Sequence, residues 1–259
     1  MTNVDVEITD HIATITLDRP PVNAVDRATL AEIGEVFAHL GDDRDVRAAI
    51  FTAAGTKAFM AGADLRSMGD EDRDQWPAAW VTDQGVAARN ALWAVYDCPV
   101  PVIAAVNGAA IGAGLAFAAV CDVIIAAEGA RFGATEINVG LLGASAHLSL
   151  LLGRHKVREL YMTGELVDAT ELHRLGAVRE VVPAERLMPA AVELATTLAK
   201  KSPIAMRLAK EALNRVEFLP LKDAYRIEQD YTRRLSMYED AEEARLAYVE
   251  KRDPEWRWR

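Results

Sequence analysis

Residues 101–144 read PVIAAVNGAAIGAGLAFAAVCDVIIAAEGARFGATEINVGLLGA, and this stretch decides the fold class. Two β-rich runs, 102–106 and 123–126, are typical of buried strands, and the Gly- and Ala-rich segment between them indicates a turn followed by a buried helix. The apolar run 102–120 is long enough to cross a bilayer. Its glycines, Asn107 and the lack of flanking Lys or Arg favour a strand and a helix inside a protein core.

The sequence before this stretch predicts an α/β arrangement. Residues 4–17 alternate apolar and polar in two runs, which predicts a β-hairpin. Asp26 is placed to cap an amphipathic helix that Gly41 ends. Residues 46–52 predict a buried strand, and a helix is expected from about 76 to 96.

The sequence after this stretch turns helical. From about Gly143 onward we expect helices to the end, apart from a short strand near 179–182. Ser202 and Pro203 mark a helix start, with Ser as the cap and Pro at the first helical position. The charge run at 69–74 is interpreted as a solvated surface loop. The architecture expected is an α/β core with a helical C-terminal third.

Composition excludes several classes of protein. The 259 residues are 51% hydrophobic and 26% charged, an ordinary globular balance. A net charge of -10 argues against a nucleic-acid partner, because neutralising phosphates needs a basic surface. Cys98 and Cys121 lie in apolar stretches without metal-site spacing, so we expect buried thiols, no disulfide and no metal. The start MTNVDVEITD has no signal-peptide pattern, which predicts a cytoplasmic protein without a membrane segment.

Two glycine-containing turns carry the candidate chemistry. Residues 57–65 read KAFMAGADL, and residues 107–115 read NGAAIGAGL. Both put small residues where unpaired backbone N–H groups can approach a ligand. Two such groups that converge on one oxygen form an oxyanion hole, which stabilises charge developing on a carbonyl. Either turn alone is explained equally well as a tight strand-to-helix connection.

Together and in this order the turns resemble the enoyl-CoA hydratase/isomerase (crotonase) family. The resemblance also covers LDRPPVNA at 17–24, the pattern NGxxxGxG…CD…FGxxE within 101–144, and AYVEKRDPEW at 247–256. It implies an α/β, ClpP-like spiral of repeated ββα units over residues 1–200. It also implies a C-terminal helical trimerisation region over residues 201–259, and therefore a homotrimer or a dimer of trimers.

The resemblance assigns roles by matching position. The backbone N–H groups of Ala63 and Ala113 would form the oxyanion hole around a thioester carbonyl. Of the family's two catalytic glutamates, the second falls on Glu136 and the first on Ala116, which cannot transfer a proton. Gly143 matches the glycine whose N–H helps to hold the attacking water in hydratases. The coenzyme A and substrate groove would be lined by Val22, Ala24, Ala61, Ala63, Asp64, Leu65, Ile111, Gly112, Ala113, Ala116, Thr135 and Glu136.

The missing glutamate shapes the expected reaction. Hydration of a 2-enoyl thioester is helped by two carboxylates, whereas a single acid–base group suits double-bond isomerisation or hydratase-lyase chemistry. We therefore expect an acyl-CoA enzyme that uses Glu136 alone, with enoyl-CoA hydratase proper as the alternative. Coenzyme A would be part of the substrate, and no separate cofactor is expected.

Each candidate also has a structural interpretation. Glu136 would cap or salt-bridge a helix near Thr135. Asp64 and Asp122 are expected to accept backbone N–H bonds at turns. His147 lies close after Gly143 but on an apolar helix, where a packing role is the commoner one. Tyr231 lies in the region from which hydratase-lyase relatives supply a tyrosine, and a core or subunit-contact role is the alternative.

Two other function classes stay open at this point. Gly108, Gly112 and Gly114 between a strand and a helix resemble the glycine pattern of short-chain NAD(P)-dependent dehydrogenases. That pattern falls mid-chain here, and no Tyr-x-x-x-Lys step accompanies it. The second alternative is a non-catalytic assembly protein on the crotonase scaffold, which Ala116 makes plausible.

Overall fold

The computed structural model describes residues 2–66 and 85–259. Its strands are β1 Val4–Thr9, β2 Ile12–Leu17, β3 Ala48–Ala53, β4 Ala58–Met60, β5 Val102–Val106, β6 Ala109–Ile111, β7 Val123–Ala127, β8 Arg131–Gly133, β9 Val167–Asp168 and β10 Glu180–Val182. Its helices are α1 Arg27–Leu40, α3 Val86–Tyr96, α4 Ala113–Val120, η1 Glu136–Val139, α5 Ser145–Leu151, α6 Arg154–Thr163, α7 Ala169–Arg174, η2 Ala184–Arg186, α8 Leu187–Ala199, α9 Pro203–Val216, α10 Leu221–Leu235 and α11 Glu239–Glu250.

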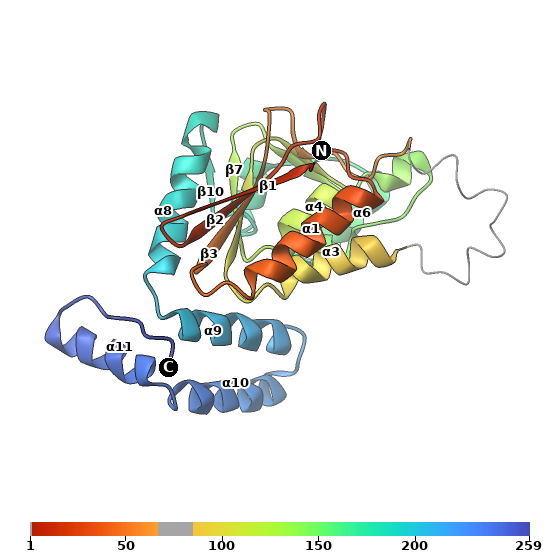
Figure 1. Ribbon diagram of the computed structural model, residues 1–259. Helices are drawn as coiled ribbons and strands as arrows, with labels where there is room; N and C mark the ends of the chain where they lie inside the picture. Colours follow the sequence, from red (N-terminus) through yellow and green to blue (C-terminus); the bar gives the residue numbers. More distant parts are fainter. Residues whose placement is uncertain (1, 67–84) are drawn as a thin grey trace.

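A six-stranded sheet forms the centre of the described part, in the order β1-β2-β3-β5-β7-β10. Only the β1–β2 hairpin is antiparallel, and the other pairs are parallel. Helix α8 covers one face, while α1, α3 and α4 lie on the other (Figure 1). Because both faces are covered, β3 and β5 are buried along their whole length, as parallel sheets require.

A second sheet gives the fold its spiral character. It has the order β4-β6-β8-β9, in which the short strands β4, β6 and β8 directly follow β3, β5 and β7, while β9 follows α6. Three successive strand pairs, β3-β4, β5-β6 and β7-β8, therefore each contribute one strand to each sheet. The expected spiral of ββα units is confirmed. These second strands end beside one another, so the turns that follow them meet at one place.

Aromatic side chains fill the space between the central sheet and its helices. Phe51 of β3 makes edge-to-face contacts with Phe37, Phe59 and Phe117 at centroid distances of 5.3, 5.2 and 6.0 Å. All four rings are fully buried. Each such pair contributes about 0.5–1.5 kcal/mol beyond area burial, so this cluster fixes α1 and α4 against the sheet.

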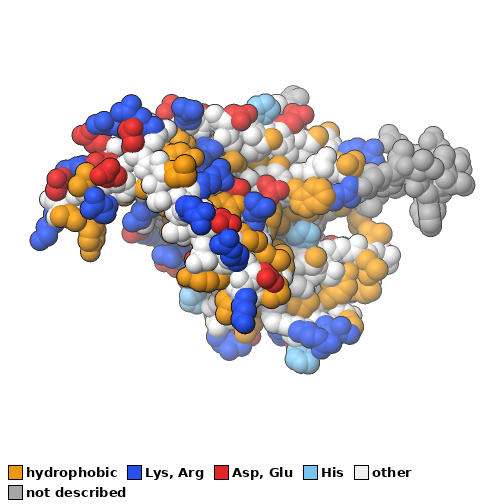
Figure 2. Space-filling view, turned by 90° about the horizontal axis from the view of Figure 1, so that it is seen from below, with side chains coloured by type: hydrophobic (Ala, Val, Ile, Leu, Met, Phe, Trp, Pro, Cys, Tyr) orange, Lys and Arg blue, Asp and Glu red, His pale blue; other side chains and the backbone are white. Residues whose placement is uncertain are grey.

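Helices α9, α10 and α11 extend below the core (Figure 1). Buried Lys210 attaches α9 to the core, because its Nζ donates to Asp122 Oδ2 at 2.7 Å and to the Val100 carbonyl at 3.2 Å. Viewed from below, this region shows apolar side chains among dense positive and negative charges (Figure 2). Phe218 and Leu221 are 77% and 83% exposed, so this region presents large apolar side chains at its surface.

Local signals in the sequence predicted several elements correctly. The hairpin forms in register, with Thr9 opposite Ile12. Asp26 caps α1 by accepting a 2.9 Å bond from the Thr29 N–H, and Ser202 caps α9. The apolar run 102–120 divides into β5, β6 and α4, and no helix in the described ranges is long and apolar enough to cross a membrane.

Other expectations need correction. We expected no strand between Gly143 and residue 179, but β9 lies there and pairs antiparallel with β8. A strand of two residues is too short to show a periodic pattern in the sequence. β9 forms because it pairs with the free edge of β8. The expected helix 76–96 is seen from Val86 onward, and its earlier part and the charge run 69–74 lie outside the described residues.

Candidate active site

The two glycine turns come together because β4 and β6 pair in parallel, with Ala58 opposite Ala109. A Cβ built on Gly108 would lie 2.6 Å from the Lys57 carbonyl oxygen. A Cβ on Gly114 would overlap the Met60 carbonyl oxygen. Both glycines are therefore required by close approach of the two turns, which explains the glycine spacing without a dinucleotide.

The N–H of Ala63 points away from Val25, the residue with which Ala63 forms a parallel β-bridge. Val25 donates to the Gly62 carbonyl at 2.9 Å, and Asp64 donates to the Val25 carbonyl at 2.8 Å. This parallel bridge uses the groups on either side of Ala63, so the N–H of Ala63 itself faces the opposite side. Within the described ranges it has no acceptor, and Ala63 is exposed.

The N–H of Ala113 is also available. Ala113 is the first residue of α4, and the first N–H groups of a helix have no partner within it. The preceding Gly112 has φ +56°, and its own N–H is used by the Gly133 carbonyl at 2.8 Å. A Cβ on Gly62 would lie 3.3 Å from the Ile111 carbonyl, so the two turns adjoin. Among the described residues the N–H groups of Ala63 and Ala113 thus have no acceptor and lie on neighbouring turns, as an oxyanion hole needs.

Glu136 begins η1, and its carboxylate lies between Gly112 and Gly143. A Cβ on Gly112 would be 3.0 Å from Glu136 Oε1, and a Cβ on Gly143 would be 2.6 Å from it. Both glycines therefore make room for the carboxylate. Glu136 Oε2 is buried and has no hydrogen-bond partner among residues 2–66 and 85–259. The capping and salt-bridge interpretations of Glu136 find no such contact there, whereas a buried carboxylate oxygen without a partner is suited to proton transfer.

Ala116 and His147 are the two other positions considered for an acid–base group. Ala116 is 3% exposed and lies one helical turn after Gly112, to whose carbonyl its N–H donates at 3.0 Å. It provides no acid–base group. His147 lies on α5, which packs against α4, and its Nδ1 is buried without a partner in the described part of the chain. Burial lowers the pKa of His147 below its ordinary value of 6.5, so the imidazole is neutral at pH 7.

Most of the predicted groove residues surround these two turns. The Val22 carbonyl accepts the Ala61 N–H at 3.1 Å, which aligns the segment containing Ala24 with the first turn. Leu65 is 52% exposed beside Ala63. Further apolar side chains stand exposed after Glu136, namely Ile137, Val139, Leu141 and Leu142. Ile111 and Thr135, which directly precede Gly112 and Glu136, are half-buried.

Three other candidates make structural contacts. Asp64 Oδ1 accepts the Arg66 N–H at 3.1 Å, and Asp122 Oδ2 accepts the Val102 N–H at 2.7 Å, as expected for turn aspartates. The buried Tyr231 on α10 donates its hydroxyl to Glu211 Oε1 on α9 at 2.8 Å. The structure therefore places Tyr231 in the contact between α9 and α10.

Sequence reasoning did not single out Arg19 or Asn23, although both lie in the quoted stretch LDRPPVNA. Asn23 is buried with φ +55°, and its Nδ2 donates to the carbonyls of Ala54 and Ala58. Arg19 binds groups on two different segments. The sequence signal for Arg19 and Asn23 was their position beside Pro20-Pro21 and just before the helix cap Asp26. Their partners Asp64, Ala54 and Ala58 are distant in sequence, so this signal did not identify them.

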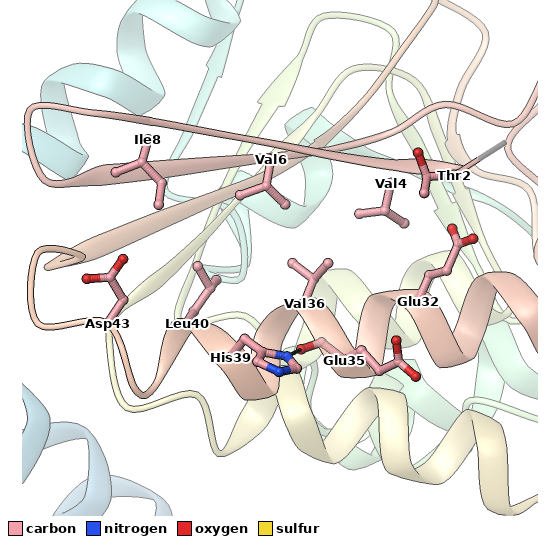
Figure 3. A pocket seen from close by; sticks show the side chains of 10 residues that line it. All are labelled: Thr2, Val4, Val6, Ile8, Glu32, Glu35, Val36, His39, Leu40 and Asp43. Carbon is pink, nitrogen blue, oxygen red and sulfur yellow. Dashed lines mark hydrogen bonds between the residues drawn. The ribbon is translucent and has the colours of Figure 1, made fainter.

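A separate cavity of about 440 Å³ lies between β1 and α1 (Figure 3). The side chains of Val4, Val6 and Ile8 point from the strand toward Val36 and Leu40 of the helix. None of the predicted site residues lines it. In the part of the chain that the structure describes, no three His, Cys, Asp or Glu side chains are grouped as a metal site would require.

Known proteins resemble this chain along nearly its whole length. The sequence profile of the enoyl-CoA hydratase/isomerase family matches residues 7–259. A protein of Rhodococcus jostii named (7aS)-7a-methyl-1,5-dioxo-2,3,5,6,7,7a-hexahydro-1H-indene-carboxyl-CoA hydrolase is 39% identical over 95% of this chain and 93% of its own. Carnitinyl-CoA dehydratase of Escherichia coli (strain K12) is 38% identical over 96% of this chain and 95% of its own.

Solved structures share the whole architecture. The enoyl-CoA hydratase of Bacillus anthracis superposes with a TM-score of 0.91 at 34% identity, covering 98% of both chains. DspI of Pseudomonas aeruginosa superposes with a TM-score of 0.92 at 33% identity, covering 99% of this chain and 97% of its own.

Proposed function

This chain belongs to the enoyl-CoA hydratase/isomerase family, and we propose that it uses Glu136 to move a proton on an acyl-CoA thioester. One observation carries the proposal. The Glu136 carboxylate lies between Gly112 and Gly143, with Oε2 buried and without a partner among the described residues. It lies beside the turns of Ala63 and Ala113, whose N–H groups have no acceptor in the same ranges. An acid–base group and an oxyanion hole in one place are the two components that enolate chemistry needs.

The reaction follows from these two components. Glu136 would remove a proton from the carbon next to the thioester carbonyl, and the electron pair would delocalise onto the carbonyl oxygen. The N–H groups of Ala63 and Ala113 would donate to that oxygen. Glu136 would then exchange this proton with solvent and donate a proton to the carbon at the far end of a 3-enoyl system, which would shift the double bond. Removal of one oxyanion donor typically costs about 100- to 1,000-fold in rate, so both N–H groups matter.

Ala116 supports isomerisation over hydration. Addition of water needs one group to activate the water and one to handle the α-proton, and position 116 provides neither. Enoyl-CoA hydration is therefore the weaker alternative. The exposed apolar residues near the turns, Leu65 and Leu142, favour an apolar acyl chain. Coenzyme A would enter as part of the substrate, and a homotrimer or a dimer of trimers is the proposed assembly.

A second candidate reaction is carbon–carbon bond cleavage in an oxygenated acyl chain. It is favoured by the Rhodococcus jostii relative, whose name describes a hydrolase of a bicyclic dioxo carboxyl-CoA thioester. The same oxyanion hole would stabilise the enolate that leaves when such a bond breaks. This reaction consumes water, which distinguishes it from isomerisation.

The test uses trans-3-hexenoyl-CoA in deuterated water enriched in heavy oxygen, with products analysed by mass spectrometry. Isomerisation predicts deuterium uptake with a shifted double bond and no heavy oxygen. Glu136→Gln should lower this rate about 100- to 10,000-fold, whereas Glu128→Gln, at an exposed turn, should not. Heavy oxygen in a 3-hydroxyacyl product would identify a hydratase instead. Full activity of Glu136→Gln would refute the role of Glu136.

A further inference from the structure

Arg19 links the two chain segments that support the first oxyanion donor. Its Nη1 donates to the Ala24 carbonyl at 2.5 Å, and its Nη2 lies 2.9 Å from both Asp26 Oδ2 and Asp64 Oδ2. The side chain is 24% exposed, and the two carboxylates are similarly half-buried. The guanidinium thus holds Ala24 and Asp26 on one side and Asp64, the neighbour of Ala63, on the other.

Hydrogen bonds attach the segment that contains Arg19, Ala24 and Asp26 to the folded core. The Asn23 side chain accepts the Arg19 N–H at 2.9 Å and binds the Ala54 and Ala58 carbonyls, which fixes the loop to β3 and β4. Asp26 also caps α1 through the Thr29 N–H. Arg19 is therefore held by elements that belong to the folded core.

The other side of the link is the segment that carries the Ala63 N–H. The direction of this N–H depends on the bridge in which Val25 donates to Gly62 and accepts from Asp64. The ion pair with Arg19 acts on the residue directly after Ala63. Hydrogen bonding to Arg19 lowers the pKa of Asp64 below its ordinary value of 3.8, so the carboxylate is charged at neutral pH.

Resting on the function proposed above, we propose that Arg19 is a positioning residue for the oxyanion hole. It holds the Asp64 carboxylate and thereby aims the Ala63 N–H at the thioester oxygen. An oxyanion donor must lie within about 2.7–3.1 Å of the charged oxygen, and a displacement of about 1 Å costs on the order of 100-fold in rate. Solvent partly screens these ion pairs, so the loss in kcat should exceed what any change in the free energy of unfolding would explain.

The experiment follows the thioester carbonyl directly. Butyryl-CoA labelled with carbon-13 at the thioester carbon is bound to the enzyme, and the carbonyl chemical shift is compared with that of the free ligand. This saturated ligand has no double bond to shift, so the change in chemical shift reports polarisation by the oxyanion hole. The turnover of trans-3-hexenoyl-CoA is measured in parallel to separate kcat from KM.

We expect Arg19→Met to lose about half or more of the carbonyl shift and to lower kcat by roughly 10- to 100-fold, with KM changed less than about threefold. Asp64→Asn should act in the same direction, and the double variant should be no worse than the poorer single one, because both remove one link. Arg19→Lys should keep part of kcat, since lysine retains the positive charge but lacks the planar guanidinium that binds several acceptors at once. Arg174→Met, which breaks an exposed pair with Glu171 on α7, is the matched control.

Two results would overturn the inference. If Arg19→Met keeps the wild-type carbonyl shift and kcat, Arg19 does not position the oxyanion donor. If Arg19→Met lowers the melting temperature and leaves both of these unchanged, Arg19 serves stability alone, and the inference is wrong as well. A wild-type protein that binds butyryl-CoA without polarising its carbonyl, or does not bind it, would overturn the proposed function as well. The two failures are distinguishable because the second appears before any substitution is made.

Discussion

Replacing Gly143 by alanine tests the placement of Glu136 more sharply than removing the carboxylate does. A Cβ at this position would lie 2.6 Å from Glu136 Oε1, whereas real Cβ contacts are not closer than 3.0 Å and become ordinary at 3.4 Å. The two groups must therefore separate by about 0.4–0.8 Å. The atom that meets the new methyl group is the end of a flexible side chain, so the carboxylate will move and the backbone will not.

The displacement predicts a large effect on rate and a small one on stability. A misplacement of about 1 Å costs on the order of 100-fold, so we expect Gly143→Ala to lower the rate of α-proton exchange by roughly 10- to 100-fold. The free energy of unfolding should change by less than about 1 kcal/mol, because alanine restricts the unfolded chain more than glycine does. Binding of free coenzyme A should be unchanged.

The assay measures deuterium uptake at the α-carbon of butyryl-CoA by mass spectrometry, beside urea unfolding of each variant. Gly153→Ala is the matched control, because a Cβ there meets nothing within 4 Å. If Gly143→Ala exchanges at the wild-type rate while Glu136→Gln does not exchange, the position of the carboxylate between the two glycines does not control the reaction. The geometric argument would then be wrong even though Glu136 is the base.

Two further predictions concern the missing glutamate and a helix cap. Ala116→Glu should raise water addition to 2-butenoyl-CoA by about tenfold or more, measured as loss of enoyl absorbance, at a stability cost of about 2–3 kcal/mol for a buried carboxyl. Ala118→Glu, equally buried on α4, should show the cost without the gain. Asp26→Ala should lower the free energy of unfolding by about 1–2 kcal/mol at pH 7, because Thr29 loses its cap partner. The Thr29 N–H bond lowers the pKa of Asp26 below 3.8, so this stabilisation is present above that pH and is lost as the pH falls through the lowered pKa. An equal deficit at pH 7 and pH 2, measured by urea unfolding, would contradict it.

Local chemistry explains which elements were predictable. The Asp26 and Ser202 caps, the Gly41 helix end and the hairpin at 4–17 depend on residues close in sequence, and each was found where expected. The second sheet was largely missed. Its strands have two or three residues each, which is too short for a periodic pattern, and their partners are distant along the chain.

The sequence by itself determined which chemical groups the candidate site can contain: one glutamate at 136, an alanine at 116 and two glycine turns. Only the tertiary structure decided how these groups meet. Parallel pairing of β4 with β6 brings the turns together. The chain after β8 places Glu136 between two glycines, and Arg19 reaches a carboxylate 45 positions away. Such contacts depend on the packing of distant segments, and neither spacing nor periodicity in one sequence records which segments will be neighbours.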